Sequence, residues 1–269
     1  MNNDTTLQQM IQIALDAGKI LKQQYDTPVE QVTKSTDADI VTATDKQVEK
    51  LISEAILSLY PDTHLVGEEG GGQGTPIEEA EYLWFVDPLD GTSNFANKIP
   101  QFCTSIALTD KNRVPLVGVI YDPMRDELYT ARQGAGATLN SKPLKVTDKT
   151  ELAQSILASG FAYDRRTNPN NNTAQWAAFI PKVRGLRRMG AAALDLAYVA
   201  AGRYDGYWER SLNAWDVMAG VLLITEAGGR VTDYQGGDTP QFDEDGRYVA
   251  SNGHIHQQML DVLAETYGW

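Results

Sequence analysis

Residues 84–94 read WFVDPLDGTSN, and this stretch indicates the fold more strongly than any other part of the chain. The apolar run Leu83–Val86 predicts a short buried strand, which the proline that follows is expected to break. The small polar residues Gly91–Asn94 then predict the start of a helix. Asp87, Asp90 and a free backbone carbonyl are thereby placed at a strand end, facing unpaired helix N–H groups. Hard oxygen ligands of this kind suit Mg²⁺, and a helix N-terminus suits phosphate.

Composition narrows the class of protein. The 269 residues suffice for one large core or two closely joined halves, and 42% hydrophobic with 22% charged residues is typical of a soluble globular protein. The net charge of −13 argues against nucleic acid as a general partner, because phosphate backbones need a basic surface. An anionic substrate must then be met by local positive charge, most simply bound cations. No stretch resembles a signal peptide or a membrane span, so we expect a cytoplasmic protein that does not bind membranes.

The cysteine and the histidines are not expected to carry the chemistry. The single cysteine, Cys103, excludes an intrachain disulfide and fits a reducing compartment. It lies in Phe102–Leu108, which predicts a buried strand, so we expect an inert core thiol. The three histidines, His64, His254 and His256, lie outside every motif described below, and we expect structural or surface roles for them.

Two amphipathic helices are predicted near the N-terminus. Apolar residues at helical spacing between Leu7 and Leu21 predict a first helix of about five turns. A second helix is signalled by Thr44, with Gln47 three residues later as a capping box, and Pro61 is expected to stop it. Together these helices predict one apolar-faced layer at the start of the fold.

The middle of the chain predicts consecutive strands without helices between them, which favours an antiparallel sheet, and from about residue 145 strand and helix patterns alternate. The predicted strands lie near 64–66, 82–86, 103–109, 114–120, 126–131 and 157–160, and the predicted helices at 173–183, 190–201 and 214–227. Residues 70–80, rich in Gly and Glu, predict a mobile surface loop. We interpret the chain as one catalytic domain, 1–269, with subdomains of roughly 1–145 and 146–269.

Acidic residues lie at the ends of several predicted elements. Glu68 follows a strand in a Gly-rich turn, while Asp45 and Asp216 lie in the first turns of helices. Each could have a purely structural role, since acids are common in turns and are favoured at helix N-termini by ~0.3–1 kcal/mol. Together with Asp87 and Asp90, however, they form a set of acids at element ends, where ligand sites in sheet proteins collect.

Several separate blocks resemble the inositol monophosphatase family, within the superfamily of Mg²⁺-dependent, lithium-inhibited phosphatases. The blocks are Lys34 with Asp39–Asp45, Gly67–Glu69, Trp84–Phe95, Gly190–Ala192, Asp205–Glu209, and Trp215–Asp216 with Glu226–Gly229. They occur in family order and cover nearly the whole chain, so chance agreement is negligible. The resemblance implies an α/β fold, a layered α-β-α-β-α sandwich of the type shared with fructose-1,6-bisphosphatase, usually assembled as a homodimer.

The resemblance also implies roles for the matching residues. The family's metal ligands, which would hold two or three Mg²⁺ ions, correspond to Glu68, Asp87, Asp90, Asp216 and the backbone carbonyl of Leu89. Glu68 with Thr92 would position the attacking water, and Asp45 would hydrogen-bond Thr92 and help to draw off its proton. The N–H groups of Gly91 and Thr92 would receive the phosphate. Such a site needs no covalent nucleophile, because phosphoryl transfer depends mainly on in-line placement and charge neutralisation.

Substrate contacts follow from the same resemblance. The residues that would face the hydroxyls of a polyol phosphate are Asp90, Ala192, Glu209 and Asp216. For Glu209, an ion pair with Arg210 or Arg203 is an alternative. For Asp195, we favour pairing with one of the arginines between 184 and 188 over a place near the substrate ring.

We predict Mg²⁺-dependent hydrolysis of a small phosphate monoester, with myo-inositol 1-phosphate as substrate and inositol and phosphate as products. Relatives with the same metal site hydrolyse histidinol phosphate, fructose 1,6-bisphosphate, 3′-phosphoadenosine 5′-phosphate or NADP, and these stay alternatives. A bisphosphate specialist needs basic side chains around the second phosphate, for which the candidates are Arg165, Arg166, Arg184, Arg187 and Arg188. Some bacterial members also act as adaptors for the transcription machinery, and the acidic charge permits such a protein partner without indicating one.

Overall fold

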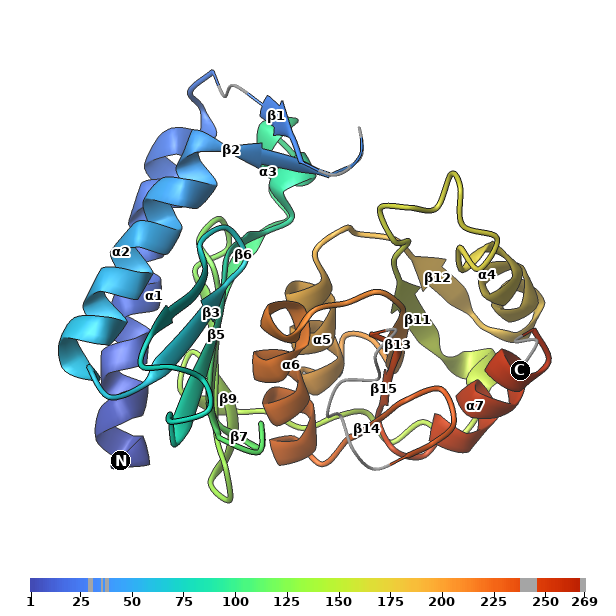
Figure 1. Cartoon of the computed structure of the whole chain (residues 1–269). Coiled ribbons are helices and arrows are strands. Elements are labelled where there is room, and N and C mark those ends of the chain that lie inside the picture. Colours follow the sequence, from blue (N-terminus) through green and yellow to red (C-terminus); the bar gives the residue numbers. More distant parts are fainter. Residues whose placement is uncertain (29–30, 35, 37–38, 238–245, 267–269) are drawn as a thin grey trace.

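The chain folds into five layers, in the order helix, sheet, helix, sheet, helix (Figure 1). The computed structural model describes residues 1–28, 31–34, 36, 39–237 and 246–266. The helices of the three helical layers are, in order, α1 (Asn3–Tyr25) with α2 (Ala43–Leu59), α5 (Ala192–Ala200) with α6 (Ala214–Glu226), and α4 (Thr173–Phe179) with α7 (His256–Ala264). This arrangement confirms the predicted α-β-α-β-α sandwich.

The first large sheet has eight strands in the order β10-β9-β8-β7-β6-β5-β3-β4. Its strands are β3 (His64–Gly67), β4 (Gly71–Gly74), β5 (Tyr82–Asp90), β6 (Cys103–Asp110), β7 (Pro115–Asp122), β8 (Glu127–Arg132), β9 (Gly136–Leu139) and β10 (Lys142–Pro143). All neighbours pair antiparallel except β3 and β5, which are parallel. The predicted loop over residues 70–80 is wrong for its first part, because β4 pairs with β3 through backbone hydrogen bonds that need no apolar side chains.

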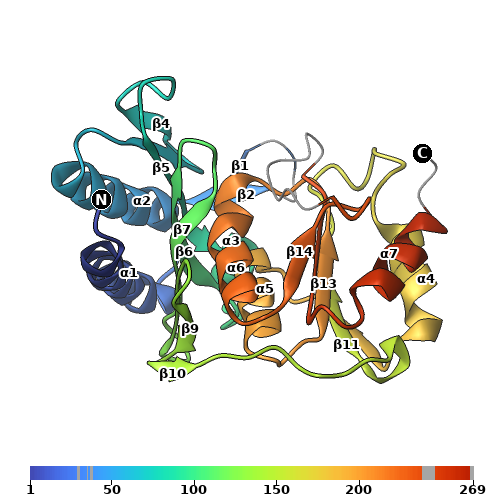
Figure 2. The ribbon, with the colours of Figure 1, turned by 90° about the horizontal axis from the view of Figure 1, so that it is seen from below.

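The second large sheet has five strands in the order β12-β11-β13-β15-β14. Its strands are β11 (Ile156–Ser159), β12 (Gly185–Arg187), β13 (Gly206–Glu209), β14 (Arg230–Thr232) and β15 (Tyr248–Ser251). In Figure 2 the chain leaves β10 at the edge of the first sheet and runs past the layer of α5 and α6 to β11. The smaller elements are the strand pair β1 (Gln31–Thr33) and β2 (Ile40–Thr42), the short helix α3 (Thr92–Ala96), and 3-10 turns at Leu152–Gln154 and Ile180–Lys182.

The middle layer explains why the sequences of α5 and α6 are apolar on all sides. Both helices are covered by a sheet on each face, so nearly every residue is buried and no polar stripe remains. A Cβ at Gly220 would lie 2.6 Å from the Cβ of Leu196, so this glycine lets the two helices pack closely. Within the described ranges, every helix is too short or too polar to cross a membrane.

Helix α2 begins two residues earlier than the sequence interpretation placed it. Thr42 is its N-cap, and the Asp45 carboxylate accepts a hydrogen bond of 2.9 Å from the Thr42 N–H. The capping box assigned to Thr44 and Gln47 is therefore wrong, because Thr42 and Asp45 form the same reciprocal arrangement one half-turn earlier. As a result, Asp45 is buried at the start of the helix, where it can reach α3.

Candidate active site

The two aspartates of residues 84–94 lie on either side of a bulge in β5. Asp87 pairs with Ser105 of β6 and Asp90 with Cys103, so β5 carries one extra residue between the two positions. Pro88 lies in this bulge, and the prediction that it ends the strand is wrong. Because proline lacks an N–H group, a bulge accommodates it without loss of a ladder hydrogen bond, and the bulge redirects the neighbouring side chains.

The backbone turns sharply from β5 into α3 at Gly91. Gly91 has φ 93°, and a Cβ there would lie 2.8 Å from the carbonyl oxygen of Gln101, so no other residue fits easily. The predicted helix start is confirmed, although α3 has only five residues. Asn94 ties α3 to the segment before α5, since its amide donates to the carbonyls of Gln101 (2.7 Å) and Met189 (2.8 Å).

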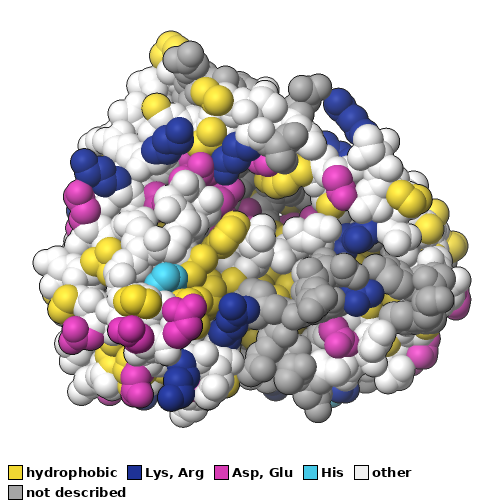
Figure 3. Space-filling view, in the orientation of Figure 1, with side chains coloured by type: hydrophobic (Ala, Val, Ile, Leu, Met, Phe, Trp, Pro, Cys, Tyr) yellow, Lys and Arg dark blue, Asp and Glu magenta, His cyan; other side chains and the backbone are white. Residues whose placement is uncertain are grey.

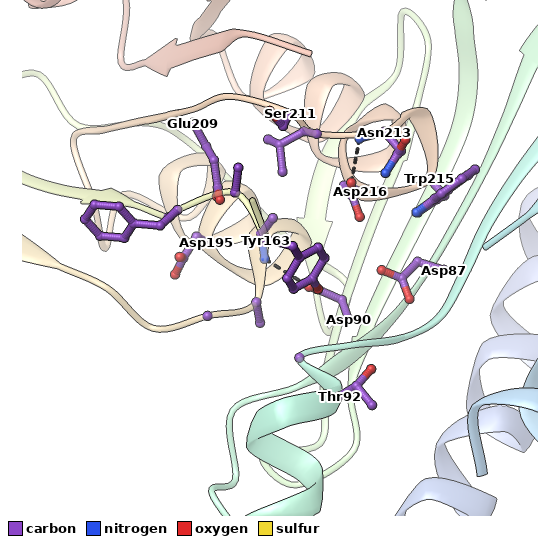
Figure 4. Close-up of a pocket in the computed structure, with 18 of the residues that line it drawn as sticks. Asp87, Asp90, Thr92, Tyr163, Asp195, Glu209, Ser211, Asn213, Trp215 and Asp216 are labelled. Carbon is purple, nitrogen blue, oxygen red and sulfur yellow. Dashed lines mark hydrogen bonds between the residues drawn. The ribbon is translucent and has the colours of Figure 1, made fainter. Parts of the chain in front are cut away.

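One cavity of about 110 Å³ brings nearly all the predicted site residues together between the end of β5, the N-terminus of α5, the end of β13 and the N-terminus of α6. The predicted residues that line it are Glu68, Asp87, Leu89, Asp90, Gly91, Thr92, Ala192, Glu209 and Asp216. Figure 4 shows the labelled acidic side chains around this common space. In Figure 3 acidic side chains gather at a hollow near the middle of the face. Asp45 does not line the cavity but contacts it through Thr92.

Asp90 joins the first sheet to α5. Its carboxylate accepts hydrogen bonds from the N–H groups of Ala192 (3.0 Å) and Ala193 (2.8 Å), where the helix dipole favours a negative charge. Burial nevertheless raises the pKa of Asp90 to about 6, against the lowering effect of these N–H groups. Cys103 contacts the same carboxylate at 3.6 Å and is fully buried, as expected for a core thiol. Burial also raises the pKa of the Cys103 thiol well above its usual value, which keeps it protonated.

Three further carboxylates share the cavity and repel one another. Burial, followed by repulsion from Glu68, Asp90 and Asp216, raises the pKa of Asp87 well above its usual value. Burial and repulsion from Glu68 do the same for Asp216. Burial raises the pKa of Glu68 to about 7, although Lys34, whose Nζ lies 2.9 Å from its Oε1, opposes the shift. These acids lie close together and have few cationic partners. A bound cation would stabilise their ionised forms.

The chemistry of the donor set fits Mg²⁺, which prefers carboxylate and carbonyl oxygens. In the described part of the chain, however, no three acidic, histidine or cysteine side chains already stand in the arrangement of a metal centre. The side chains are instead engaged by backbone N–H groups: Asp87 accepts from Leu89 (2.9 Å), and Asp216 accepts from Asn213 (2.6 Å). Metal binding therefore requires these carboxylates to turn toward a common point.

Thr92 and Asp45 form a hydrogen-bonded pair at the edge of the cavity. The Thr92 hydroxyl lies 2.9 Å from the Asp45 Oδ1 and 3.0 Å from the carbonyl oxygen of Leu89. Asp45 is fully buried, and burial raises its pKa against the lowering effect of hydrogen bonds from Thr42 and Thr92. The pair thus combines a hydroxyl at the cavity with an internal proton acceptor.

Glu209 enters the cavity from the end of β13 and is held by Tyr207, whose hydroxyl donates to it. Gly160 makes room for this carboxylate, since a Cβ there would overlap it. Burial raises the pKa of Glu209 to about 7. The alternative ion pairs are contradicted, because Arg203 binds Glu127 (2.6 Å) and no described ion pair joins Glu209 to Arg210.

The predicted pairing of Asp195 with an arginine is also wrong within the described residues. Asp195 is buried, lines the cavity, and its Oδ1 has no hydrogen-bond partner. Arg188 attracts it electrostatically, but no ion pair within 4.0 Å forms between them. Helix α5 directs Asp195 inward, where it faces the space beside Asp90 and Glu209.

Some residues of the cavity were given no role from the sequence. Phe161 and Tyr163 line it, and Lys34, beside it, contacts Glu68 and Glu69. Arg188, a candidate from the sequence for pairing with Asp195 or for a second phosphate, also lines the cavity. Phe161 and Tyr163 belong to a loop without periodicity, so no local pattern indicated their position. Lys34 belongs to a block that matches the family. Because that block is rich in acids, a lysine within it was the signal from which a contact with site carboxylates could have been predicted.

Comparison with known proteins shows which family the chain belongs to. A model described as the inositol monophosphatase family matches residues 2–267. The chain is 43% identical over 237 residues to a Synechocystis protein named inositol-1-monophosphatase, covering 88% of this chain and 80% of that protein. It is 39% identical over 264 residues to a Pseudomonas aeruginosa protein named Nus factor SuhB, covering 96% of each. The solved structure of inositol monophosphatase from Anabaena (Nostoc) matches with a TM-score of 0.89 and 43% identity, covering 99% of this chain and 98% of that one. The chain belongs to the inositol monophosphatase family.

Proposed function

We propose that the protein hydrolyses small phosphate monoesters with Mg²⁺ as cofactor, and that myo-inositol 1-phosphate is its substrate. The observation that carries the proposal is the cavity itself, in which the buried carboxylate of Asp87 is repelled by those of Asp90 and Asp216 beside the Thr92–Asp45 pair. Such a concentration of carboxylates is costly unless cations bind there, and cations are what a phosphoryl group needs.

The residues proposed to hold two or three Mg²⁺ ions are Glu68, Asp87, Asp90, Asp216 and the carbonyl of Leu89. When bound, Mg²⁺ neutralises the charge of the phosphoryl group and lowers the pKa of a coordinated water. The assignment agrees with the lining of the cavity, to which all five residues contribute.

The chain's own residues are proposed to place the water and remove its proton. The Thr92 hydroxyl donates to Asp45 at 2.9 Å, which leaves an oxygen lone pair free to accept a hydrogen bond from a water in the cavity. As the Thr92 oxygen takes the proton of that water, the Thr92 hydroxyl proton passes to the Asp45 carboxylate. Glu68, which lines the same cavity, is proposed to orient that water. The N–H groups of Gly91 and Thr92, which have no partner within the first turn of α3, are proposed to bind the phosphate oxygens.

Asp90, Asp216, Glu209 and Ala192 are proposed to line the place of the inositol ring. Carboxylates accept hydrogen bonds from hydroxyl groups, and Glu209 is already oriented by Tyr207. Ala192 contributes its backbone, whose N–H group also holds Asp90 in place.

Gly160→Ala tests the role of Glu209. We expect the KM for myo-inositol 1-phosphate to rise about tenfold with little change in kcat, because the added methyl displaces the carboxylate and weakens a charged hydrogen bond to the substrate. Steady-state kinetics measure both constants. Gly185→Ala is the matched control, since it adds the same methyl in β12, the neighbour of the strand that precedes Gly160, near only the flexible end of Arg187. An unchanged KM in a folded Gly160→Ala protein would argue against a substrate contact by Glu209.

A comparison of substrates tests the proposed function directly. At equal concentration and with Mg²⁺, we expect faster phosphate release from myo-inositol 1-phosphate than from histidinol phosphate, fructose 1,6-bisphosphate, 3′-phosphoadenosine 5′-phosphate or NADP. Chelation with EDTA should abolish release, and added Mg²⁺ should restore it, because the carboxylates alone supply no positive charge. A preference of about tenfold or more for another compound, a difference of ~1.4 kcal/mol in transition-state binding, would overturn the inositol assignment.

The adaptor role stays a second hypothesis, in addition to catalysis. Relatives named Nus factor SuhB are 38–40% identical to this chain, and relatives named inositol-1-monophosphatase are 39–43% identical. Because the two ranges overlap, overall identity does not separate the two roles. The homodimer and the absence of a nucleic-acid partner likewise stay expectations from the family resemblance and the charge.

A further inference from the structure

Helix α2 carries a second buried acid, Glu49, one helical turn after Asp45. Its carboxylate accepts hydrogen bonds from the turn after β3, where the donors are the N–H groups of Glu69, at 2.8 Å, and Gly70. The peptide unit that joins Glu68 to Glu69 provides the first of these N–H groups, so the bond also restricts the Glu68 backbone. Glu68 lines the candidate active site and Glu49 does not, so any effect of Glu49 on the reaction passes through the turn.

Two glycines bring the turn close enough for this contact. A Cβ at Gly67 would lie 2.7 Å from the Glu49 Cδ, and a Cβ at Gly70 would lie 2.7 Å from its Oε1. Neither glycine has a positive φ, so the backbone conformation of the turn does not account for them. The missing side chains instead make room for the carboxylate, which indicates that the close contact itself is what the two glycines serve.

One helix thereby holds both groups that are proposed to place the attacking water. Asp45 binds the Thr92 hydroxyl at 2.9 Å, and Glu49 binds the turn that carries Glu68. The two acids of α2 are four residues apart, so they project from the same face of the helix, about 6 Å apart along its axis. Because one turn of an α-helix is stiff, this arrangement fixes the Glu68 turn relative to Thr92.

A purely structural role would be to satisfy the N–H groups of a turn. Glu226 of α6 does this elsewhere, since its carboxylate accepts from the N–H groups of Gly134 and Gly136, each at 2.7 Å, outside the candidate active site. Glu49 differs because the turn that it holds carries a residue of the site. The two carboxylates otherwise make the same kind of contact, so Glu226 is a matched reference for Glu49.

We infer that Glu49 is a positioning residue for the reaction: through the turn after β3 it holds the Glu68 carboxylate in place relative to the Thr92 hydroxyl. The inference rests on the proposed function, because it takes Glu68 and Thr92 to place the water and Glu68 to bind Mg²⁺. Groups that orient a metal ligand typically change metal affinity or activity by about 10–100-fold when they are removed. Glu49 should therefore affect turnover and Mg²⁺ binding together, and leave the contacts of the substrate ring unchanged.

Glu49→Ala tests the inference, with Glu226→Ala as the matched control. For Glu49→Ala we expect kcat for myo-inositol 1-phosphate to fall about 10–100-fold, with KM within about twofold of the original at saturating Mg²⁺. Thermal unfolding gives a readout without turnover: the Mg²⁺ concentration that produces half of the rise in Tm should increase about tenfold. Glu226→Ala also loses two backbone contacts and should lower the Tm of the metal-free protein, but kcat and the Mg²⁺ response should stay nearly unchanged.

Two milder variants weaken the same contact. In Glu49→Gln one acceptor oxygen faces two N–H groups, so kcat should lie between those of the original enzyme and Glu49→Ala. In Gly70→Ala the added methyl displaces the carboxylate and kcat should fall, whereas Gly72→Ala, which adds a methyl beside only the His64 ring, should keep it. Circular dichroism shows whether each variant folds, and these two carry the test if Glu49→Ala does not.

The outcomes separate the inference from the proposed function. Equal changes in kcat and in the Mg²⁺ response for Glu49→Ala and Glu226→Ala would overturn the positioning role. An unchanged kcat in a folded Glu49→Ala protein would also overturn it, and both results leave the proposed function intact. An original enzyme that does not hydrolyse myo-inositol 1-phosphate would overturn the proposed function, and the positioning role of Glu49 with it.

Discussion

Asp87→Asn is expected to lower turnover by about three orders of magnitude and, in the absence of metal, to make the protein more stable to heat. Asp87 is 2% exposed and is repelled by Glu68, Asp90 and Asp216. Removing its charge takes away a proposed metal ligand, and a loss of ~4 kcal/mol of transition-state stabilisation corresponds to this decrease in rate. The asparagine keeps an oxygen that can accept the hydrogen bond from the Leu89 N–H, so the local backbone is preserved.

The gain in stability follows from the sign of the pKa shift. Because burial and repulsion raise the pKa of Asp87 in the folded protein, its ionised form opposes folding, and stability falls as the pH rises through the folded-state pKa. Asp87→Asn removes this penalty at neutral pH. Thermal unfolding in EDTA should therefore show a higher Tm than the original protein, whereas added Mg²⁺ should raise the Tm of the original protein more than that of the variant.

Asp122→Asn is the matched control for Asp87→Asn. Asp122 is equally buried, but its carboxylate is paired with Arg125 at 2.6 Å and lies outside the cavity. Loss of its charge should lower the Tm and leave turnover nearly intact, since it breaks a favourable ion pair. Full activity of Asp87→Asn, or a lower Tm in EDTA, would contradict the assignment of the acidic cluster to metal binding.

Thr92→Ala is expected to lower kcat by about 10²–10⁴-fold with little change in KM, the range typical of a lost general acid–base group. The Thr92 hydroxyl has one proton and two acceptors in reach, Asp45 at 2.9 Å and the Leu89 carbonyl at 3.0 Å. When it donates to Asp45, its oxygen can accept a hydrogen bond from water, and as it takes the water proton its own proton passes to the Asp45 carboxylate. Alanine removes this path but leaves the carboxylates of the site in place.

Thr92→Ser distinguishes the effect of the hydroxyl group on turnover from the effect of the side chain's shape. Serine keeps the oxygen in the same position, so most of kcat should return, and Asp45→Asn should resemble Thr92→Ala because it removes the proton acceptor. Pre-steady-state and steady-state phosphate release measure the loss. Equal kcat values for the alanine and serine variants would show that the hydroxyl does not take part in proton removal.

Local patterns in the sequence were sufficient for most helices and strands. The apolar spacing between Leu7 and Leu21 predicted α1, and the runs near 103–109, 114–120 and 126–131 predicted β6, β7 and β8. Such patterns work because an element with one or two buried faces must repeat its apolar residues at its own period. They failed at β4, whose pairing depends on backbone hydrogen bonds, and at Thr42, where two possible capping boxes differ by two residues.

The family resemblance named the acids, but it did not decide their contacts. Asp90 holds the N-terminus of α5, 102 residues away from it at Ala192, and Glu209 is held by Tyr207 rather than by an arginine. Contacts at such separations depend on how the two sheets pack around α5 and α6. No local rule contains that information.

By itself, the sequence determined most helices and strands along the chain and the acids at the ends of elements, because periodicity and turn chemistry act over a few residues. The layered sandwich was implied by the family resemblance, and the order of the strands within each sheet came from the tertiary structure. Only the tertiary structure decided that Pro88 lies in a bulge, that Asp195 has no close cationic partner among the described residues, and that Arg165 and Arg188 share a cavity with Thr92. The reason is physical: burial and charge neighbourhood are properties of segments brought together by folding, and they decide pKa values, hydrogen-bond partners and cavities.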